Sequence, residues 1–277
     1  MATGVLEKDL IPQSHLWKMG LGINARSLEV VLFPPVASEP IIHRSIALNP
    51  TVPTLRAVED AVYENPLLLS EFREIVCAIE GDKYMIVPPE VAKDTDLCET
   101  AFETQNPSEE SMQLLAFETS ARNASVVTAV SRDLFGFLKR SFYNTRFSQP
   151  MVELINHVST LSAEADGAVM MLVRIRDERI DQVCVEGDKL LLANSFRITA
   201  PIDAAYYILA TRKKLGISPD GALRLAGPVE QRRQTADILR PYLSDVADLP
   251  LPSRLWQSGV PALTAPLHLL LLPLSCV

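Results

Sequence analysis

GAVMMLVRIRDERIDQVCVEGDKLLLANSFRITAPIDAAYYILATRKKLG, residues 167–216, is the stretch of sequence that decides the fold. Three apolar runs rich in Val, Ile and Leu are separated by short polar turns, a pattern typical of β-strands. After Pro201 the apolar residues recur at helical spacing, and Gly216 is a residue that commonly ends a helix. The stretch therefore predicts three strands and then a helix, at Val169–Arg176, Ile180–Glu186, Leu190–Thr199 and Ile202–Leu215.

A weaker copy of this pattern lies earlier in the chain, in residues 16–65. Placing Ile23–Phe33 over Ile175–Val185, an offset of 152 residues (175 − 23), puts polar residues on both turns and apolar residues in step. Leu28 then corresponds to Ile180, and a third strand and a helix follow in each copy. A repeat of this length indicates a duplicated domain rather than a solenoid. The alternative is that two unrelated meanders followed by helices would align equally well.

The residues between the two copies continue the α/β pattern. We expect a fourth strand at Arg73–Glu80, a hairpin formed by Met112–Thr119 and Ser125–Ser131, and helices at Arg132–Phe142 and Met151–Leu161. The acidic segment Asp94–Ser111 is expected to be a surface excursion or a loose loop, and residues 1–15 an unpaired lead-in.

Strands and helices in this order, twice over, predict a mixed-sheet α/β protein of two similar halves. The expected domains are residues 1–165 for the first half and 166–260 for the second. Residues 261–277 form an apolar C-terminal tail that is expected to pack back on the core.

Charge and composition exclude several classes of partner. The net charge is −8 and the sequence pI is about 5.1. Nucleic-acid binding favours a basic surface, so we expect no nucleic-acid partner. Contact with an anionic membrane is disfavoured for the same reason.

The four cysteines and the two termini point to the cytoplasm. No two cysteines have CxxC spacing, so reduced thiols are expected rather than a zinc or redox motif. The first residues lack both the basic and the apolar region of a signal peptide. The apolar tail is interrupted by Pro261, Pro266 and Pro273 and is too short to span a bilayer.

The predicted topology resembles the duplicated ribonuclease-H-like domains of the actin-like ATPase superfamily. The run DERIDQVCVEGDKLLLANSFRITAPIDAAYYILATRKKLGI, followed by LRLAGPVE, resembles more specifically a Bacteroidetes family of unknown function that has the actin-like fold. The resemblance implies two tandem domains of this type, each with a mixed five-stranded sheet flanked by helices.

The resemblance also implies where a nucleotide would bind, and there the chain departs from the superfamily. Active members carry an aspartate and a glycine in the first turn of each copy, which hold Mg²⁺ and approach the phosphates. Here the first turn carries Asn24 and Ser27 without a glycine, and the second carries Asp177 between two arginines. On the nucleoside side only Gly227 remains, because Pro228 replaces its glycine partner.

Other clusters of functional residue types have simpler structural explanations. We interpret Asp177, Glu178 and Asp181 as a solvated turn. The four histidines have no metal-ligand spacing, so no metal site is expected.

The sequence therefore favours a non-catalytic scaffold or protein-interaction protein, with no cofactor and an unidentified protein partner, and with a homodimer as a further option. The alternative is a nucleotide-binding or kinase-like ATPase with an altered cleft, in which Asn24, Ser27, Asp177 and Gly227 would hold ATP and magnesium. A third hypothesis is a platform for membrane machinery, with the apolar tail as its docking segment.

Overall fold

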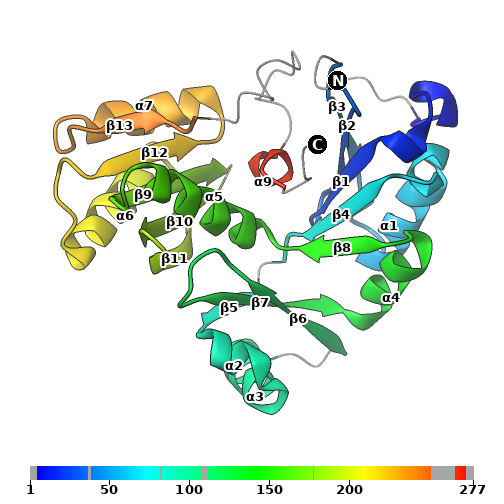
Figure 1. The fold of residues 1–277 in the computed structure, drawn as a ribbon, viewed down its shortest axis with the longest axis horizontal. Coiled ribbons are helices and arrows are strands. Elements are labelled where there is room, and N and C mark those ends of the chain that lie inside the picture. The colour runs from blue at the N-terminus through cyan, green and yellow to red at the C-terminus, as the bar shows by residue number, and fades with distance from the viewer. Residues whose placement is uncertain are drawn as a thin grey trace.

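The computed structural model describes residues 5–36, 39–81, 83–107, 111–176, 178–250 and 266–272. Three sheets with flanking helices make up the fold (Figure 1). The strands are β1 Lys18–Ile23, β2 Ser27–Phe33, β3 Ile42–Ala47, β4 Glu74–Ile79, β5 Tyr84–Val87, β6 Met112–Glu118, β7 Ser125–Ser131, β8 Thr145–Ser148, β9 Val169–Arg176, β10 Arg179–Glu186, β11 Lys189–Arg197, β12 Ala222–Ala226 and β13 Val246–Asp248. The α-helices are α1 Thr54–Tyr63, α2 Pro89–Lys93, α3 Thr95–Gln105, α4 Arg132–Ser141, α5 Pro150–Glu164, α6 Pro201–Leu215, α7 Val229–Leu239 and α9 Leu267–Leu270. Short 3-10 helices are η1 Lys8–Leu10, η2 Ser14–Leu16 and η3 Pro66–Leu69.

The two five-stranded sheets have the same topology. The first has the order β3-β2-β1-β4-β8 and the second the order β11-β10-β9-β12-β13. In each sheet the first three strands form an antiparallel meander, and the last two run parallel to the first strand. Ile23 faces Leu28 across the first hairpin, just as Ile175 faces Ile180 across the second. The predicted fold class of two mixed five-stranded sheets flanked by helices is therefore confirmed.

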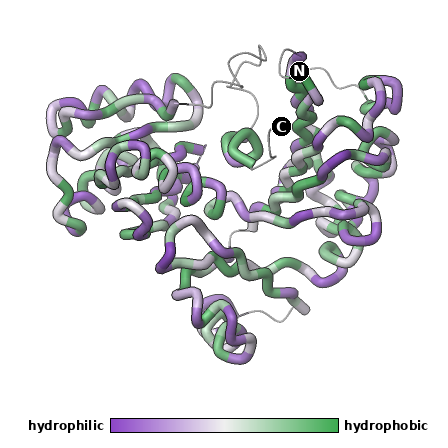
Figure 2. Tube along the Cα trace, in the orientation of Figure 1, coloured by the Kyte–Doolittle hydropathy of each residue, from purple (hydrophilic) through white to green (hydrophobic). Residues whose placement is uncertain are grey.

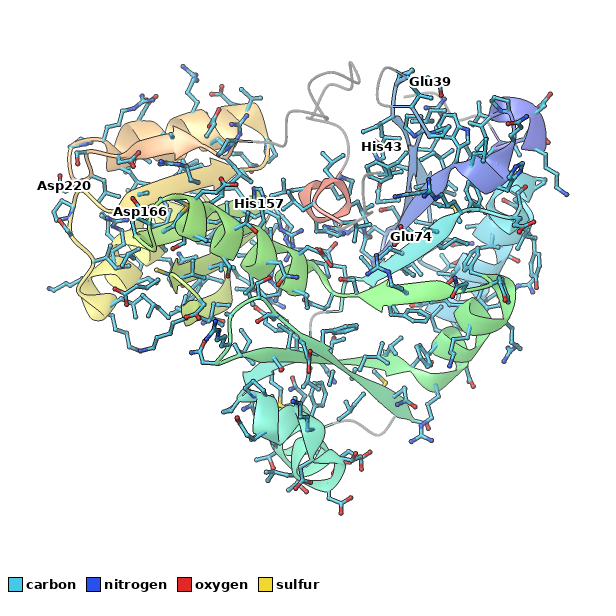
Figure 3. The ribbon with its side chains drawn as sticks, viewed as in Figure 1. Glu39, His43, Glu74, His157, Asp166 and Asp220 are labelled. Atoms are coloured by element: carbon cyan, nitrogen blue, oxygen red, sulfur yellow. The ribbon has the colours of Figure 1, made fainter. Side chains whose placement is uncertain are left out.

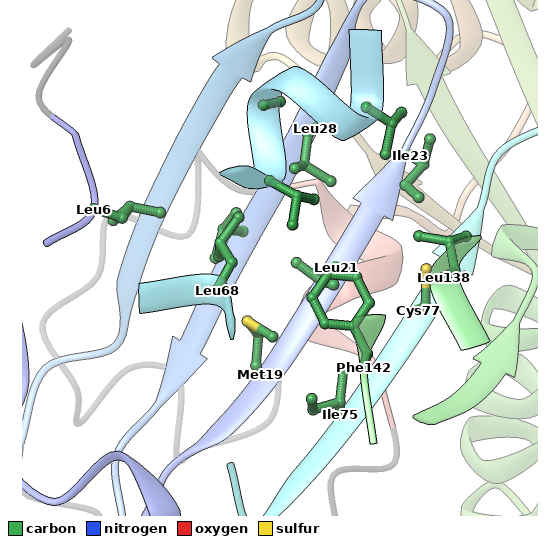
Figure 4. Packing of buried hydrophobic residues seen from close by; sticks show 14 of the residues in the cluster. Leu6, Met19, Leu21, Ile23, Leu28, Leu68, Ile75, Cys77, Leu138 and Phe142 are labelled. Carbon is green, nitrogen blue, oxygen red and sulfur yellow. The ribbon is translucent and has the colours of Figure 1, made fainter. Parts of the chain in front are cut away.

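The first sheet has two different faces because β1 alternates large residues with glycines. Met19, Leu21 and Ile23 are buried against the helices α1 and α4, where they join the main core cluster (Figure 4). Gly20 and Gly22 point to the opposite face, which we call the inner face. Alternation along a strand thus gives the sheet one densely packed side and one side with room for other side chains.

The last helix of each half crosses to the sheet of the other half. Helix α5 follows the last strand of the first sheet, yet its buried side chains, including Leu154 and Ile155, pack with Leu172 and Val183 of the second sheet. Segment α9 comes after the second sheet and lies against the inner face of the first. In Figure 1, α9 accordingly lies between the two halves. The halves are therefore joined by exchanged elements as well as by the chain.

A third sheet, β5-β7-β6, is inserted in the first half and packs beside the second. Its loop residue Asn123 exchanges hydrogen bonds of 2.8 and 3.0 Å with the backbone of Leu190 in β11. Tyr84 Oη lies 2.9 Å from Ser195 Oγ, also in β11. The inserted sheet is thus a second tie between the halves.

Two predictions about irregular segments are wrong. Part of the acidic segment 94–111 is the helix α3, because Asp94 accepts a hydrogen bond from Leu97 N as its N-cap and the side chains of Cys98 and Phe102 are buried on one face. The lead-in is also partly anchored, because Leu6 is buried and its backbone N–H donates to Asn65 Oδ1.

Candidate functional site at the junction of the two halves

The first hairpin turn is closed by its own side chains. Asn24 Oδ1 accepts hydrogen bonds from the backbone N–H groups of Arg26 and Ser27, at 2.8 and 2.9 Å. The Asn24 amide in turn donates to Ser27 Oγ at 2.9 Å. This is a side-chain-supported turn of the kind that asparagine commonly forms. The backbone N–H groups of Asn24, Arg26 and Ser27 are therefore already used within the turn.

Ser27 leads into a buried carboxylate. Ser27 Oγ donates to Glu29 Oε1 at 2.5 Å and Ser45 Oγ donates to the same oxygen at 2.7 Å. His43 Nε2 lies 2.8 Å from Glu29 Oε2. Burial by itself would raise the pKa of Glu29, but the hydrogen bonds from His43, Ser27 and Ser45 outweigh it and hold the pKa below its usual value. Glu29 therefore remains an acceptor that is satisfied within the first sheet.

The second hairpin carries a network of buried charges. Arg174 Nε donates to Asp181 Oδ2 at 2.8 Å, and Arg174 Nη2 reaches Glu80 Oε1 at 3.2 Å. Arg176 Nη2 donates to Asp181 Oδ1 at 3.0 Å, and its Nη1 also pairs with Glu80. Ser195 Oγ donates to Asp181 Oδ1 at 2.6 Å. Glu80 follows the first sheet's strand β4, so this network joins the two halves.

The charges of this network stabilise one another. Burial would raise the pKa of Asp181, but Arg174 and Arg176 lower it to about 2. The pKa of Glu80 is also lowered, because the nearby guanidinium groups outweigh the effect of burial. Both carboxyl groups are therefore ionised, and two carboxylates balance two guanidinium groups.

Segment α9 completes the network through His268. Arg174 Nη1 lies 2.8 Å from His268 Nδ1. Because a guanidinium can only donate, Nδ1 is the acceptor and Nε2 carries the proton. Burial, together with the charge of Arg174, lowers the pKa of His268 to about 4, although Glu80 opposes the shift. Neutral His268 is thus the sixth member of what we call the junction network: Glu80, Arg174, Arg176, Asp181, Ser195 and His268.

A small cavity lies beside the junction network. A cavity bounded by Glu80, Tyr84, Arg176, Asp181 and Ser195 has a volume of about 10 Å³. A cavity of that size holds about one water molecule. This cavity is too small for a phosphate chain.

Gly227 is required by packing. Its φ is +122°, and a Cβ at this position would lie 2.3 Å from the backbone oxygen of Ile175. The carbonyl of Gly227 accepts a hydrogen bond of 2.9 Å from Arg232 Nε. A glycine here is therefore explained by the close approach of β9.

Two of the four predicted site residues, Asn24 and Ser27, hydrogen-bond to each other within the first turn. Gly227 lies against Ile175 of the second half. Asp177 lies outside the described residues. Within the part of the chain that the structure describes, there is no group of three or more His, Cys, Asp or Glu residues that could hold a metal ion.

Sequence reasoning missed the junction network. Asp181, which we expected in a solvated turn, is buried and doubly ion-paired, whereas Glu178 is exposed. The signal was present in β9, where Arg174 interrupts the apolar run Met170–Ile175. A charge in the middle of a buried strand indicates a partner elsewhere in the chain.

Two halves of the same sheet topology define a protein of the actin-like ATPase fold. The chain belongs to the family described as "Protein of unknown function (DUF3822)", whose model matches residues 9–246. It is similar to a crystal structure of a Bacteroides thetaiotaomicron VPI-5482 protein with actin-like ATPase fold and unknown function. The two chains share 17% identity with a TM-score of 0.75, over 93% of this chain and 100% of that chain.

A second solved structure supports the fold alone. It is the PilM–PilN type IV pilus biogenesis complex, with 14% identity and a TM-score of 0.54, covering 89% of this chain and 90% of that chain. No curated protein matches the chain in sequence. Among the helices that the structure describes, none has the length and apolar character needed to cross a membrane.

Proposed function

We propose that this chain is a non-catalytic interaction or scaffold protein built on the actin-like fold. The observation that carries the proposal is the junction network, in which the carboxylates of Glu80 and Asp181 are paired with arginines beside a cavity of about 10 Å³. In this proposal ion pairs hold the halves together where active relatives of the fold hold a nucleotide.

The chemistry of the junction supports the absence of ATP hydrolysis. Phosphates are bound by free backbone N–H groups and cations, and Mg²⁺ by free carboxylate oxygens. Here the N–H groups of Arg26 and Ser27 already donate to Asn24. The carboxylates of Glu80 and Asp181 are paired with arginines. A nucleotide would have to displace these interactions before it gained its own.

The ties between the halves support a fixed scaffold. In enzymes made of two domains, substrate binding commonly causes the domains to close around the substrate. Here α5 crosses to the sheet of the second half, and the inserted sheet is bonded to β11 through Asn123 and Tyr84. Fixed halves present constant surfaces, which suits a protein whose task is to bind another.

The partner that we propose is another protein, and the compartment is the cytoplasm. A structure of similar fold was solved as a complex, PilM with PilN, which is a fold-level analogy for protein binding. The cysteines among the described residues, Cys77, Cys98 and Cys184, are free and buried, as is common in a reducing compartment.

A thermal-shift titration with Mg-ATP and Mg-GTP tests the proposal. We expect no rise in melting temperature at millimolar nucleotide and no phosphate release, for the wild type and for two variants. Arg176→Met removes a junction arginine, and Arg56→Met removes an exposed one, paired with Asp60, as its matched control. A saturable shift that Arg176→Met alters and Arg56→Met leaves unchanged would establish the rival, a nucleotide-binding protein with an altered cleft.

A further inference from the structure

The inner face of the first sheet is covered by a short leucine-rich segment. Residues 266–272 have the sequence PLHLLLL, and only Leu267–Leu270 are helical. Leu269, Leu270 and Leu272 are buried in one apolar cluster, whose other members are Val31, Phe33, Ile41, Val76 and Ala78. Figure 2 shows α9 as a mostly apolar element between the two halves.

The other side of this segment contacts α5, the helix that follows the first sheet in the chain. Leu267 and Leu271 pack on the cluster that contains α5. In the view of Figure 3, α9 lies between His157 of α5 and His43 of β3. The segment therefore occupies a groove between the inner face of the first sheet and α5, which we call the tail groove.

Two glycines shape the tail groove to receive leucines. A Cβ at Gly20 would lie 2.9 Å from Leu272 Cδ1, and a Cβ at Gly22 would lie 2.9 Å from Leu269 Cδ1. Neither glycine has a positive φ, so space rather than backbone conformation is what these positions provide. The groove thus has two leucine sites that match leucines three residues apart.

His268 fits the polar end of the groove imperfectly. Its Nδ1 accepts from Arg174, while its buried Nε2, which carries the proton, has no hydrogen-bond partner among the described residues. A buried donor without a partner weakens the docked state. The four-residue helix also adds little stability of its own. The tail is therefore a displaceable occupant.

We propose that the tail groove is a docking site for a leucine-rich helical segment of a partner protein, and that residues 266–272 occupy it in cis as a competitor. This inference rests on the proposed interaction function and names the class of partner. Because the charges of the network are balanced, the best partner carries a neutral acceptor, such as Asn or Gln, where His268 lies. In this partner segment a leucine follows the acceptor directly, and a second leucine lies three residues after the first, with the spacing of Leu269 and Leu272.

The cis segment sets how tightly a partner binds. A tethered competitor acts at a millimolar effective concentration, so it lowers the apparent affinity of any segment supplied in trans. Weakening the cis segment should therefore strengthen binding in trans without any change to the groove.

Fluorescence anisotropy on the full chain tests this directly. The probe is a labelled peptide of residues 264–274 in which His268 is replaced by Gln. We expect the double variant Leu269→Asp with Leu272→Asp to bind the peptide at least about tenfold more tightly than the wild type. Adding Gly22→Val to that variant should abolish binding, because the valine fills a leucine site. Leu97→Asp, at an exposed leucine of α3, is the control and should leave the wild-type affinity unchanged.

A second measurement does not depend on variants. Excess peptide should increase hydrogen exchange in residues 267–272 of the wild-type chain, because the displaced segment loses its protection.

Equal peptide affinity of wild type and double variant, or binding that survives Gly22→Val, would overturn the proposal. A concentration-dependent dimer of the wild type would instead assign the groove to the tail of a second copy. A negative result in the peptide experiments would overturn the docking groove but not the proposed non-catalytic function. Nucleotide binding would overturn the non-catalytic function without changing the peptide result.

Discussion

Arg174 is the residue on which the junction network depends. Its guanidinium is buried and contacts Asp181, Glu80 and His268. Arg174→Met would leave two buried carboxylates short of a partner, so we expect a loss of about 3–5 kcal/mol in the free energy of unfolding. Arg240 forms an exposed ion pair with Asp237, so Arg240→Met should lower the free energy of unfolding by less than about 0.5 kcal/mol. Equal losses in urea titrations would show that the network contributes nothing beyond an ordinary surface pair.

The contributions of Asp181 and Glu153 to the free energy of unfolding should change with pH in opposite directions. The pKa of Asp181 is lowered to about 2, so its contribution is present above its ordinary pKa near 3.8 and is lost as the pH falls toward 2. Glu153 is buried on α5 with Ser148 as its hydrogen-bond partner, and burial raises its pKa from 4.5 to about 7. Its contribution is present below pH 4.5 and is lost as the pH rises through 7.

Glu153→Gln should therefore stabilise the protein above pH 7 and change little below pH 4.5, since the amide resembles the protonated acid. The expected gain in the free energy of unfolding is about 2–3 kcal/mol at pH 8. Urea titrations at pH 4.5 and 8 measure it. A gain that is the same at both pH values would contradict the assignment.

At the scale of elements, the turn from β12 into α7 depends on Gly227. Gly227→Ala places a Cβ against the backbone of Ile175 in β9, so we expect a loss of more than about 3 kcal/mol in the free energy of unfolding. Gly216, at the end of α6, has a φ of +67° with open space around it. Gly216→Ala should cost only about 1 kcal/mol, the usual cost of a left-handed residue. Similar losses for the two variants would show that the close approach to β9 is unimportant.

The elements that could be predicted are those whose signal is local. The offset between Ile23 and Ile175 aligned the two hairpins correctly because a strand's alternation is visible within a few residues. Helix α3 was missed because it is polar and buries only Cys98 and Phe102. The ion pair of Arg174 with Glu80 spans 94 residues of sequence, and nothing in the local pattern of either strand indicates the other.

At the scale of the whole molecule, the exchanged elements and the junction network make one connected unit of the two halves. A protein that closed around a nucleotide would have to break the pairs of Glu80 with Arg174 and Arg176, which join β4 to β9. We therefore expect hydrogen exchange in β4, β9 and α5 to be equally slow with and without nucleotide. Faster exchange at these elements on adding Mg-ATP would show a hinge that the account excludes.

Isothermal titration calorimetry of the full chain with Mg-ATP and Mg-GTP tests the central claim most directly, because it measures occupancy of the junction without a mutation or a label. We expect no saturable heat at millimolar nucleotide, because the carboxylates of Glu80 and Asp181 are paired with arginines and the cavity beside them is only about 10 Å³ in volume. A saturable isotherm with one nucleotide per chain and a dissociation constant below millimolar would contradict it.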